Sequence, residues 1–183
     1  TFLLAIIGQV TAWKGHEVAL RALPTVLKQY PNTRLLIVGK SLWSEDKIYA
    51  QHLANLVKEL HLSEHVLFTG FRQDIPLMLA SLDLLIHCPI KPDPLPRILL
   101  EAGAQEALIV ASRVGGIPEQ VLDGETGFLV EPNQPKELAQ AIIKGLSDDS
   151  LALHLRTMAG KRMRDLFSIQ QHVTRIEAIY NLI

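Results

Sequence analysis

Cysteine is almost absent from this chain of 183 residues, since Cys88 is the only one. A lone cysteine excludes an internal disulfide and is typical of proteins in a reducing compartment. Cys88 also lies within an apolar stretch, where a free cysteine commonly acts as a small core residue. We therefore expect a cytoplasmic protein without disulfides.

The chain also lacks an excess of charge of either sign. It has 18 basic and 19 acidic residues, so that the formal net charge is -1, and aromatic residues make up only 5%. Nucleic-acid binding requires a basic surface, and no basic tract with interleaved aromatic residues is present. We expect no nucleic-acid partner.

No hydrophobic run approaches the roughly 18 residues that a membrane-spanning helix requires. The apolar segment at residues 1–8 is too short, and it lacks the basic flank and cleavage site of a signal peptide. It is better interpreted as a β-strand. Because the chain does not begin with Met, we expect it to be part of a longer protein.

Patterns typical of metal sites are missing as well. The seven histidines are scattered without the spacing of metal ligands, and no Asp-any-Asp pair could hold a divalent cation. The sequence therefore predicts no metal site.

What the chain does have is a repeated order of strand and helix. Apolar stretches rich in Ile, Leu and Val alternate with amphipathic segments of helical length, which is typical of parallel sheets with crossover helices. We predict one α/β domain, a doubly wound, Rossmann-like six-stranded parallel sheet with helices on both faces and extra C-terminal helices. The predicted strands are residues 1–8, 34–40, 65–70, 82–89, 108–112 and 128–130.

Two details of the helices can be predicted. Pro24 lies within the first helical segment and should kink or split it, because proline lacks the amide that a helix interior uses. The last segment carries an apolar stripe at helical spacing. Its members are Val173, Ile176, Tyr180 and Ile183.

The stretch from Asp93 to Glu101, Asp-Pro-Leu-Pro-Arg-Ile-Leu-Leu-Glu, is the strongest candidate for a binding site. A helix should begin at Pro96 or Arg97, leaving the amides of Ile98 and Leu99 free to bind an anion such as phosphate. The two carboxylates should flank the same spot, which suits vicinal hydroxyls beside a phosphate, as in a nucleotide-sugar. The alternative is structural: Arg97 and Glu101 could form a surface pair and Asp93 could start a turn.

An ordered set of fragments across the chain resembles the C-terminal half of group-one, retaining glycosyltransferases of the GT-B fold. The fragments are Gly8-Gln9, Lys14-Gly15, Val38-Gly39, residues 68–72, Asp83, 93–101, 110–119 and 123–130. The resemblance implies that residues 1–183 form a nucleotide-sugar donor-binding domain, and that the acceptor domain of the whole enzyme precedes it and is missing.

The resemblance also implies roles for charged residues. Glu101 would accept hydrogen bonds from the ribose hydroxyls of the donor, and Asp93, in place of the usual Glu, would approach the transferred sugar. Lys14 would neutralise the diphosphate. The family has an additional Arg where this chain has Gln9, and our hypothesis is that Arg97 supplies the missing charge.

Further donor contacts are implied on the neighbouring loops. Phe71 and Arg72 match the loop that receives the nucleobase, largely through backbone groups. Leu95 and Pro96 replace a usual Phe-Gly pair before the phosphate-binding helix, so that one amide donor is lost. Gly8 and Gly39 match donor-contacting positions, although glycines that end strands are needed by any such fold.

The function implied is retaining transfer of a hexosyl unit from a donor such as UDP-glucose or GDP-mannose, without a metal or another cofactor. The isolated chain should have little or no activity, and the missing half could bind a membrane surface. Two alternatives stay open. The departures at Gln9, Asp93 and Pro96 would suit a non-catalytic nucleotide-binding module, and a sugar-nucleotide epimerase can have a related fold.

Overall fold

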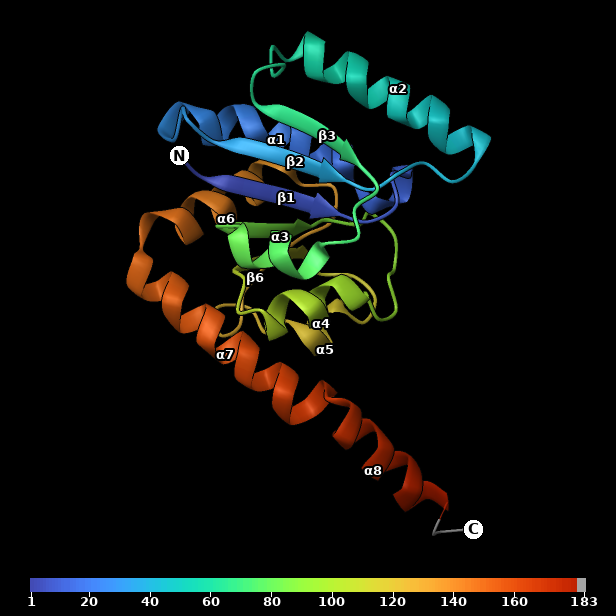
Figure 1. Cartoon of the computed structure of the whole chain (residues 1–183). Helices are drawn as coiled ribbons and strands as arrows, with labels where there is room; N and C mark the ends of the chain where they lie inside the picture. Colours follow the sequence, from blue (N-terminus) through green and yellow to red (C-terminus); the bar gives the residue numbers. More distant parts are fainter. Residues whose placement is uncertain (181–183) are drawn as a thin grey trace.

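The computed structural model describes residues 1–180, which form a parallel β-sheet covered by helices (Figure 1). All six strands are parallel and lie in the spatial order β3-β2-β1-β4-β5-β6. The strands are β1 (Leu3–Ile7), β2 (Arg34–Val38), β3 (Val66–Gly70), β4 (Leu84–His87), β5 (Ile109–Ser112) and β6 (Phe128–Val130). The predicted doubly wound, Rossmann-like α/β fold is confirmed.

The central strands are continuous apolar runs because both of their faces are buried. Every residue of β4 and β5 is buried, and so is β1 after Leu3. The predicted fourth strand, 82–89, was too long at both ends. Asp83 lies before β4, where its carboxylate accepts a hydrogen bond of 2.6 Å from the amide of Leu3 and anchors the start of β1.

Helices cover both faces of the sheet, and each face has its own apolar cluster. One cluster includes Leu20, Leu56 and Ile142, from α1, α2 and α6. The other includes Leu79 and Leu99, from α3 and α4. The helices are α1 (His16–Gln29), α2 (Ser44–Glu59), α3 (Ile75–Ser81), α4 (Arg97–Ala104), α5 (Ile117–Gln120), α6 (Pro135–Ser147), α7 (Asp149–Phe167) and α8 (Ile169–Tyr180).

Pro24 does not split the first helix. It lies inside α1, which runs without a break from His16 to Gln29. The expected split is therefore wrong. Leu23 and Val26, on either side of the proline, are fully buried against the sheet. We attribute the continuity of α1 to this packing, which can offset the lost backbone hydrogen bond.

The C-terminal helices leave the body of the domain. Figure 1 shows α7 crossing the domain and α8 extending beyond it. The predicted stripe is exposed along α8, since the exposed fractions are 45% for Val173, 42% for Ile176 and 73% for Tyr180. The fourth member, Ile183, lies outside the described residues.

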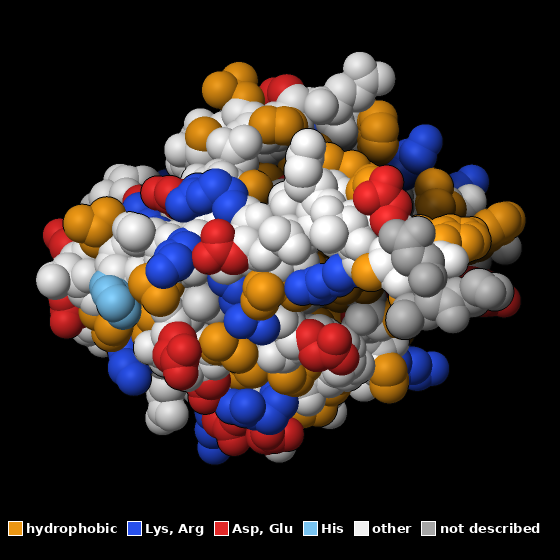
Figure 2. Space-filling model, turned by 90° about the horizontal axis from the view of Figure 1, so that it is seen from below, with side chains coloured by type: hydrophobic (Ala, Val, Ile, Leu, Met, Phe, Trp, Pro, Cys, Tyr) orange, Lys and Arg blue, Asp and Glu red, His pale blue; other side chains and the backbone are white. Residues whose placement is uncertain are grey.

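The face of the domain seen in Figure 2 carries a mixed surface. Basic and acidic side chains alternate there with apolar ones, and neither sign gathers into a broad patch. This agrees with the formal net charge of -1. Among the helices of residues 1–180, none is both long and apolar enough to cross a membrane.

Substitutions on α7 can test how far this helix contributes to the core. Leu155 is fully buried, whereas Leu153, on the same helix, is 66% exposed. Leu155→Ala should lower the free energy of unfolding by about 2 to 5 kcal/mol, because it removes buried methyl groups and leaves a cavity. Leu153→Ala should change it by less than about 0.5 kcal/mol. Urea unfolding measures both, and equal losses would show that α7 is not packed as described.

Candidate functional site

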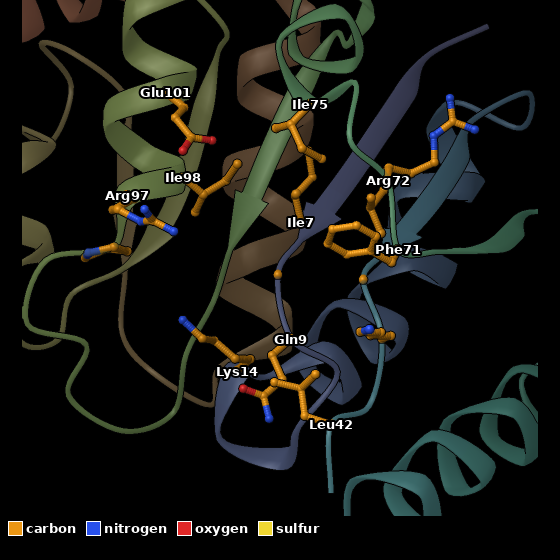
Figure 3. A pocket seen from close by; sticks show the side chains of 15 residues that line it. Ile7, Gln9, Lys14, Leu42, Phe71, Arg72, Ile75, Arg97, Ile98 and Glu101 are labelled. Atoms are coloured by element: carbon orange, nitrogen blue, oxygen red, sulfur yellow. The ribbon is translucent and has the colours of Figure 1, made fainter.

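A cleft of about 520 Å³ opens at the carboxyl edge of the sheet, where the first three strands and α4 meet. Its volume lies within the range of small-molecule binding sites. Figure 3 shows Arg97, Ile98 and Glu101 of α4 on one side, Phe71 on the other, and Gln9 and Lys14 on the loop below. The lining residues are Ile7, Gly8, Gln9, Lys14, Val38, Gly39, Lys40, Leu42, Phe71, Arg72, Ile75, Pro96, Arg97, Ile98 and Glu101.

The floor of the cleft depends on a close backbone contact between the ends of β1 and β2. Gly39 has φ +143°, and a Cβ atom there would lie 1.7 Å from the carbonyl oxygen of Gly8. The amide of Gly8 in turn donates to the carbonyl of Val38 at 2.9 Å. A larger residue at position 39 would force the two loops apart, so this glycine is required by the close approach.

Helix α4, which forms one wall of the cleft, begins where the sequence predicts. Pro96 has extended backbone angles and precedes Arg97, the first helical residue. The amide of Leu99 differs from the expectation, because it already donates to the carbonyl of Pro96 at 3.1 Å. The amides at the open end of the helix are therefore those of Arg97 and Ile98, and the positive end of the helix dipole points in the same direction.

Four basic side chains line the cleft, and they differ in how far their charge is already balanced. Arg72 donates to Asp74 at 2.8 Å through Nε, and Figure 3 shows its side chain pointing away from the centre of the cleft. Lys40 lies 5.3 Å from the centre of the Phe71 ring, a cation–π distance. Among residues 1–180, no ion pair involves Lys40 or Arg97. These two cations and the helix end can attract an anion.

Glu101 and Asp93, which were expected to flank one spot, differ in their access to the cleft. Glu101 lines the cleft, but Asp93 is not among the lining residues and is only 6% exposed. The Asp93 carboxylate accepts a hydrogen bond of 2.7 Å from Lys14 and lies 3.2 Å from His87 Nε2. Leu95 is exposed, but it is not among the lining residues either.

Asp93 and His87, which are buried next to Lys14, have defined charge states. Hydrogen bonds from His87 and Lys14 lower the pKa of Asp93 to about 2, so the carboxylate is ionised at neutral pH. Burial lowers the pKa of His87 below its ordinary value of 6.5, so its ring is neutral. A neutral ring near a carboxylate carries its proton on the facing nitrogen, and His87 Nε2–H therefore donates to Asp93.

Gln9, at the position where the resemblance implies an arginine, has a partner that the sequence did not reveal. Its amide nitrogen donates to Asp46 of α2 at 2.7 Å. Hydrogen bonds from the side chains of Thr11 and Gln9 hold the pKa of Asp46 below its usual range. Gln9 thus joins the first loop to α2 with its side-chain nitrogen already in use.

Sequence reasoning missed several residues of the cleft. Lys40 directly follows Gly39 at the end of the second predicted strand, so the rule that ligands bind at strand ends could have identified it. No comparable signal pointed to Leu42 or Ile75, which line the cleft from a loop and from α3. Within the described part of the chain, no three His, Cys, Asp or Glu residues lie together as a metal site would require.

Proteins of known sequence or structure are similar to this chain over nearly its whole length. The family model described as "Glycosyl transferases group 1" matches residues 1–164. The spore coat protein SA of Bacillus subtilis is 27% identical over 97% of this chain and 48% of its own length. This chain therefore spans about half the length of that relative.

Two solved structures have the same fold. Anabaena Alr3699/HepE in complex with UDP has a TM-score of 0.94 and 28% identity, and the match covers 100% of this chain and 49% of that protein. The C-terminal domain of a group 1 family protein, LpcC from Francisella tularensis, has a TM-score of 0.84 and 26% identity. That match covers 92% of this chain and 87% of the domain. Sequence and fold agree, and the chain belongs to the group 1 glycosyl transferases.

Proposed function

We propose that this chain binds a nucleoside diphosphate sugar and forms the donor half of a glycosyltransferase that transfers a hexosyl unit with retention of configuration. One observation carries the proposal: the open end of α4, with Arg97 and Ile98, shares a cleft with Lys14 and with the carboxylate of Glu101. A diphosphate and a ribose require these two kinds of group side by side. Support also comes from Anabaena Alr3699/HepE, which has been solved with UDP-glucose.

The proposed chemistry depends on stabilising the leaving nucleoside diphosphate while positive charge develops at the sugar carbon. Lys14, Arg97 and the open amides of α4 would hold the developing negative charge. Lys40 would add a further cation near Phe71, on the side proposed for the nucleobase. Because side chains and amides would balance the diphosphate charge, we propose a metal-independent reaction.

A non-catalytic nucleotide-binding module is the second candidate. It is favoured by the contacts of Gln9 with Asp46 and of Asp93 with Lys14, since each side chain is already engaged by the protein and Asp93 does not line the cleft. If the full-length protein binds donor nucleotides tightly but transfers no sugar, the non-catalytic module is the correct function.

The isolated 183-residue chain should bind the donor nucleotide yet transfer sugar poorly or not at all. The physical reason is that an acceptor would be held by a preceding domain, in keeping with the match to only half of the relative's length. Incubation with UDP-glucose or GDP-mannose and an acceptor panel, followed by mass spectrometry, checks this. Sustained transfer by the chain alone would contradict the proposal.

The role of Glu101 can be tested with a pair of ligands. Glu101→Ala should lower the affinity for UDP about 10- to 100-fold, which is the effect of losing a hydrogen bond to a charged group. The same variant should bind 2′,3′-dideoxy-UDP as the wild type does, because that ligand lacks the ribose hydroxyls. Titration calorimetry measures both affinities, with GDP and dideoxy-GDP as a second series.

Glu64→Ala, which removes an exposed carboxylate from a loop, is the matched control and should leave the affinities unchanged. Equal weakening of UDP and its dideoxy analogue by Glu101→Ala would show that Glu101 does not bind the ribose.

Arg97→Ala tests whether this residue supplies the charge that Gln9 cannot. It should lower the affinity for UDP about 10- to 100-fold and leave the affinity for uridine almost unchanged, because the guanidinium would contact the phosphates. The loss should shrink as salt is raised, since ions screen the attraction. Arg175→Ala, on the exposed helix α8, is the control. Unchanged UDP affinity in Arg97→Ala would refute this role.

A further inference from the structure

Lys14 and Asp93 form a unit that crosses from the wall of the cleft into the protein interior. The ammonium nitrogen of Lys14 lies 2.7 Å from Asp93 Oδ2, and the exposed fractions of the two side chains are 18% and 9%. The same oxygen lies 3.2 Å from His87 Nε2. Only Lys14 of the three lines the cleft. From this arrangement we propose that Asp93 positions the Lys14 ammonium for the donor diphosphate and does not itself contact the sugar.

The loop that carries Lys14 is fixed to the end of β4. Gly15 has φ +76°, and a Cβ atom there would lie 1.8 Å from the carbonyl oxygen of Cys88. The Cys88 thiol donates to the carbonyl of Gly15 at 3.2 Å, and the amide of Ile90 donates to the carbonyl of Trp13 at 2.8 Å. The backbone of Lys14 therefore has a set distance from the segment that leads to Asp93.

The loop that carries Asp93 is held from the opposite side by two glycines. The amide of Gly116 donates to the carbonyl of Asp93 at 3.0 Å. A Cβ atom on Gly115 would lie 2.4 Å from that same carbonyl oxygen, and one on Gly116 would lie 1.8 Å from the carbonyl oxygen of Pro94. The backbone of Asp93 is therefore held against the loop after β5, while its side chain is held by the contacts with Lys14 and His87.

Hydrogen bonding explains why this arrangement suits a diphosphate. An ammonium has three N–H donors, of which one is used by Asp93. The ring of Trp13, 4.2 Å from the nitrogen, further restricts the ammonium by a cation–π contact. The remaining donors can bind phosphate oxygens. His87 has a different role: the N–H of its neutral ring donates to the Asp93 carboxylate and holds it in the orientation that Lys14 needs.

The inference rests on the proposed function, because it assumes a nucleoside diphosphate ligand. Titration calorimetry with UDP and UDP-glucose, and with GDP and GDP-mannose, can test the inference separately from the proposed function. Wild-type protein that binds none of these ligands would overturn the proposed function. Wild-type binding that Asp93→Asn leaves unchanged would overturn the inference alone. Corresponding domains fold by themselves, since one has been solved as a C-terminal domain.

The expected result for Asp93→Asn is a loss of about tenfold in affinity, equal for the nucleoside diphosphate and for its sugar conjugate. Lys14→Met should cause a similar or larger loss, and the double variant should bind no worse than Lys14→Met, because Asp93 acts only through Lys14. Additive losses, or a loss confined to the sugar conjugate, would overturn the inference. Asp165→Asn, the same change at an exposed position of α7, is the control.

Asp93→Glu gives an independent outcome. A longer side chain cannot keep the hydrogen bonds to Lys14 and His87 without moving one of these groups, so the affinity for UDP should fall. A residue that touched the sugar would behave differently. The longer side chain would then raise the affinity for UDP-glucose relative to that for UDP, and that result would overturn the inference.

A measurement without ligand tests the same contact. The pKa of Asp93 is about 2 in the folded protein and 3.8 ordinarily, so its ionised form stabilises the fold above pH 4 and this contribution is lost as the pH falls toward 2. The stability difference between the wild type and Asp93→Asn should therefore shrink over this range. Lys14→Met should reduce that pH dependence. A difference that is constant from pH 7 to pH 2 would exclude the contact.

Discussion

Close backbone contacts at the carboxyl edge of the sheet are the constraint on which the site depends. At three places a glycine lets one loop touch another: Gly39 meets Gly8, Gly15 meets Cys88, and Gly116 meets Pro94. A Cβ atom at any of these glycines would come within 1.8 Å of a carbonyl oxygen. The loops after β1, β2, β4 and β5 therefore keep fixed distances, and the charged side chains that they carry are placed by backbone packing.

Pairing of charges on this framework shapes the electrostatics of the cleft. Lys14 and Arg72 each contact a carboxylate that does not line the cleft, whereas Lys40 and Arg97 have no such partner among residues 1–180. Gln9, neutral and bound to Asp46, adds no charge. The attraction for an anion is therefore concentrated at Lys40, Arg97 and the open end of α4, and Lys14 lines the same cleft with its ammonium held by Asp93.

Much of the fold could be predicted because it is encoded locally. Buried parallel strands are continuous apolar runs, and each of the six appeared at the predicted place with small errors at its ends. Helix α4 begins at Arg97, directly after Pro96, because the fixed φ and missing amide of proline suit the start of a helix. The continuity of α1 through Pro24 could not be predicted, since it depends on how both sides of the proline pack against the sheet.

The site was predictable only in part, and Asp93 shows why. It lies eight residues before Glu101, and that spacing suggested that both carboxylates serve one ligand. Prolines at positions 92, 94 and 96 make the segment irregular, so no helical or strand period fixes the direction of the Asp93 side chain. The glycines of a distant loop, Gly115 and Gly116, decide its position.

By itself the sequence determined the order of strands and helices, the family, and the loops that carry the cleft, because apolar periodicity and glycine or proline positions act over short stretches of chain. Only the tertiary structure decided which side chains meet. Lys14 and Asp93 are 79 residues apart, and Gln9 and Asp46 are 37 apart. Their contacts exist because β1 lies between β2 and β4 in the sheet, an arrangement that the packing of the whole chain selects.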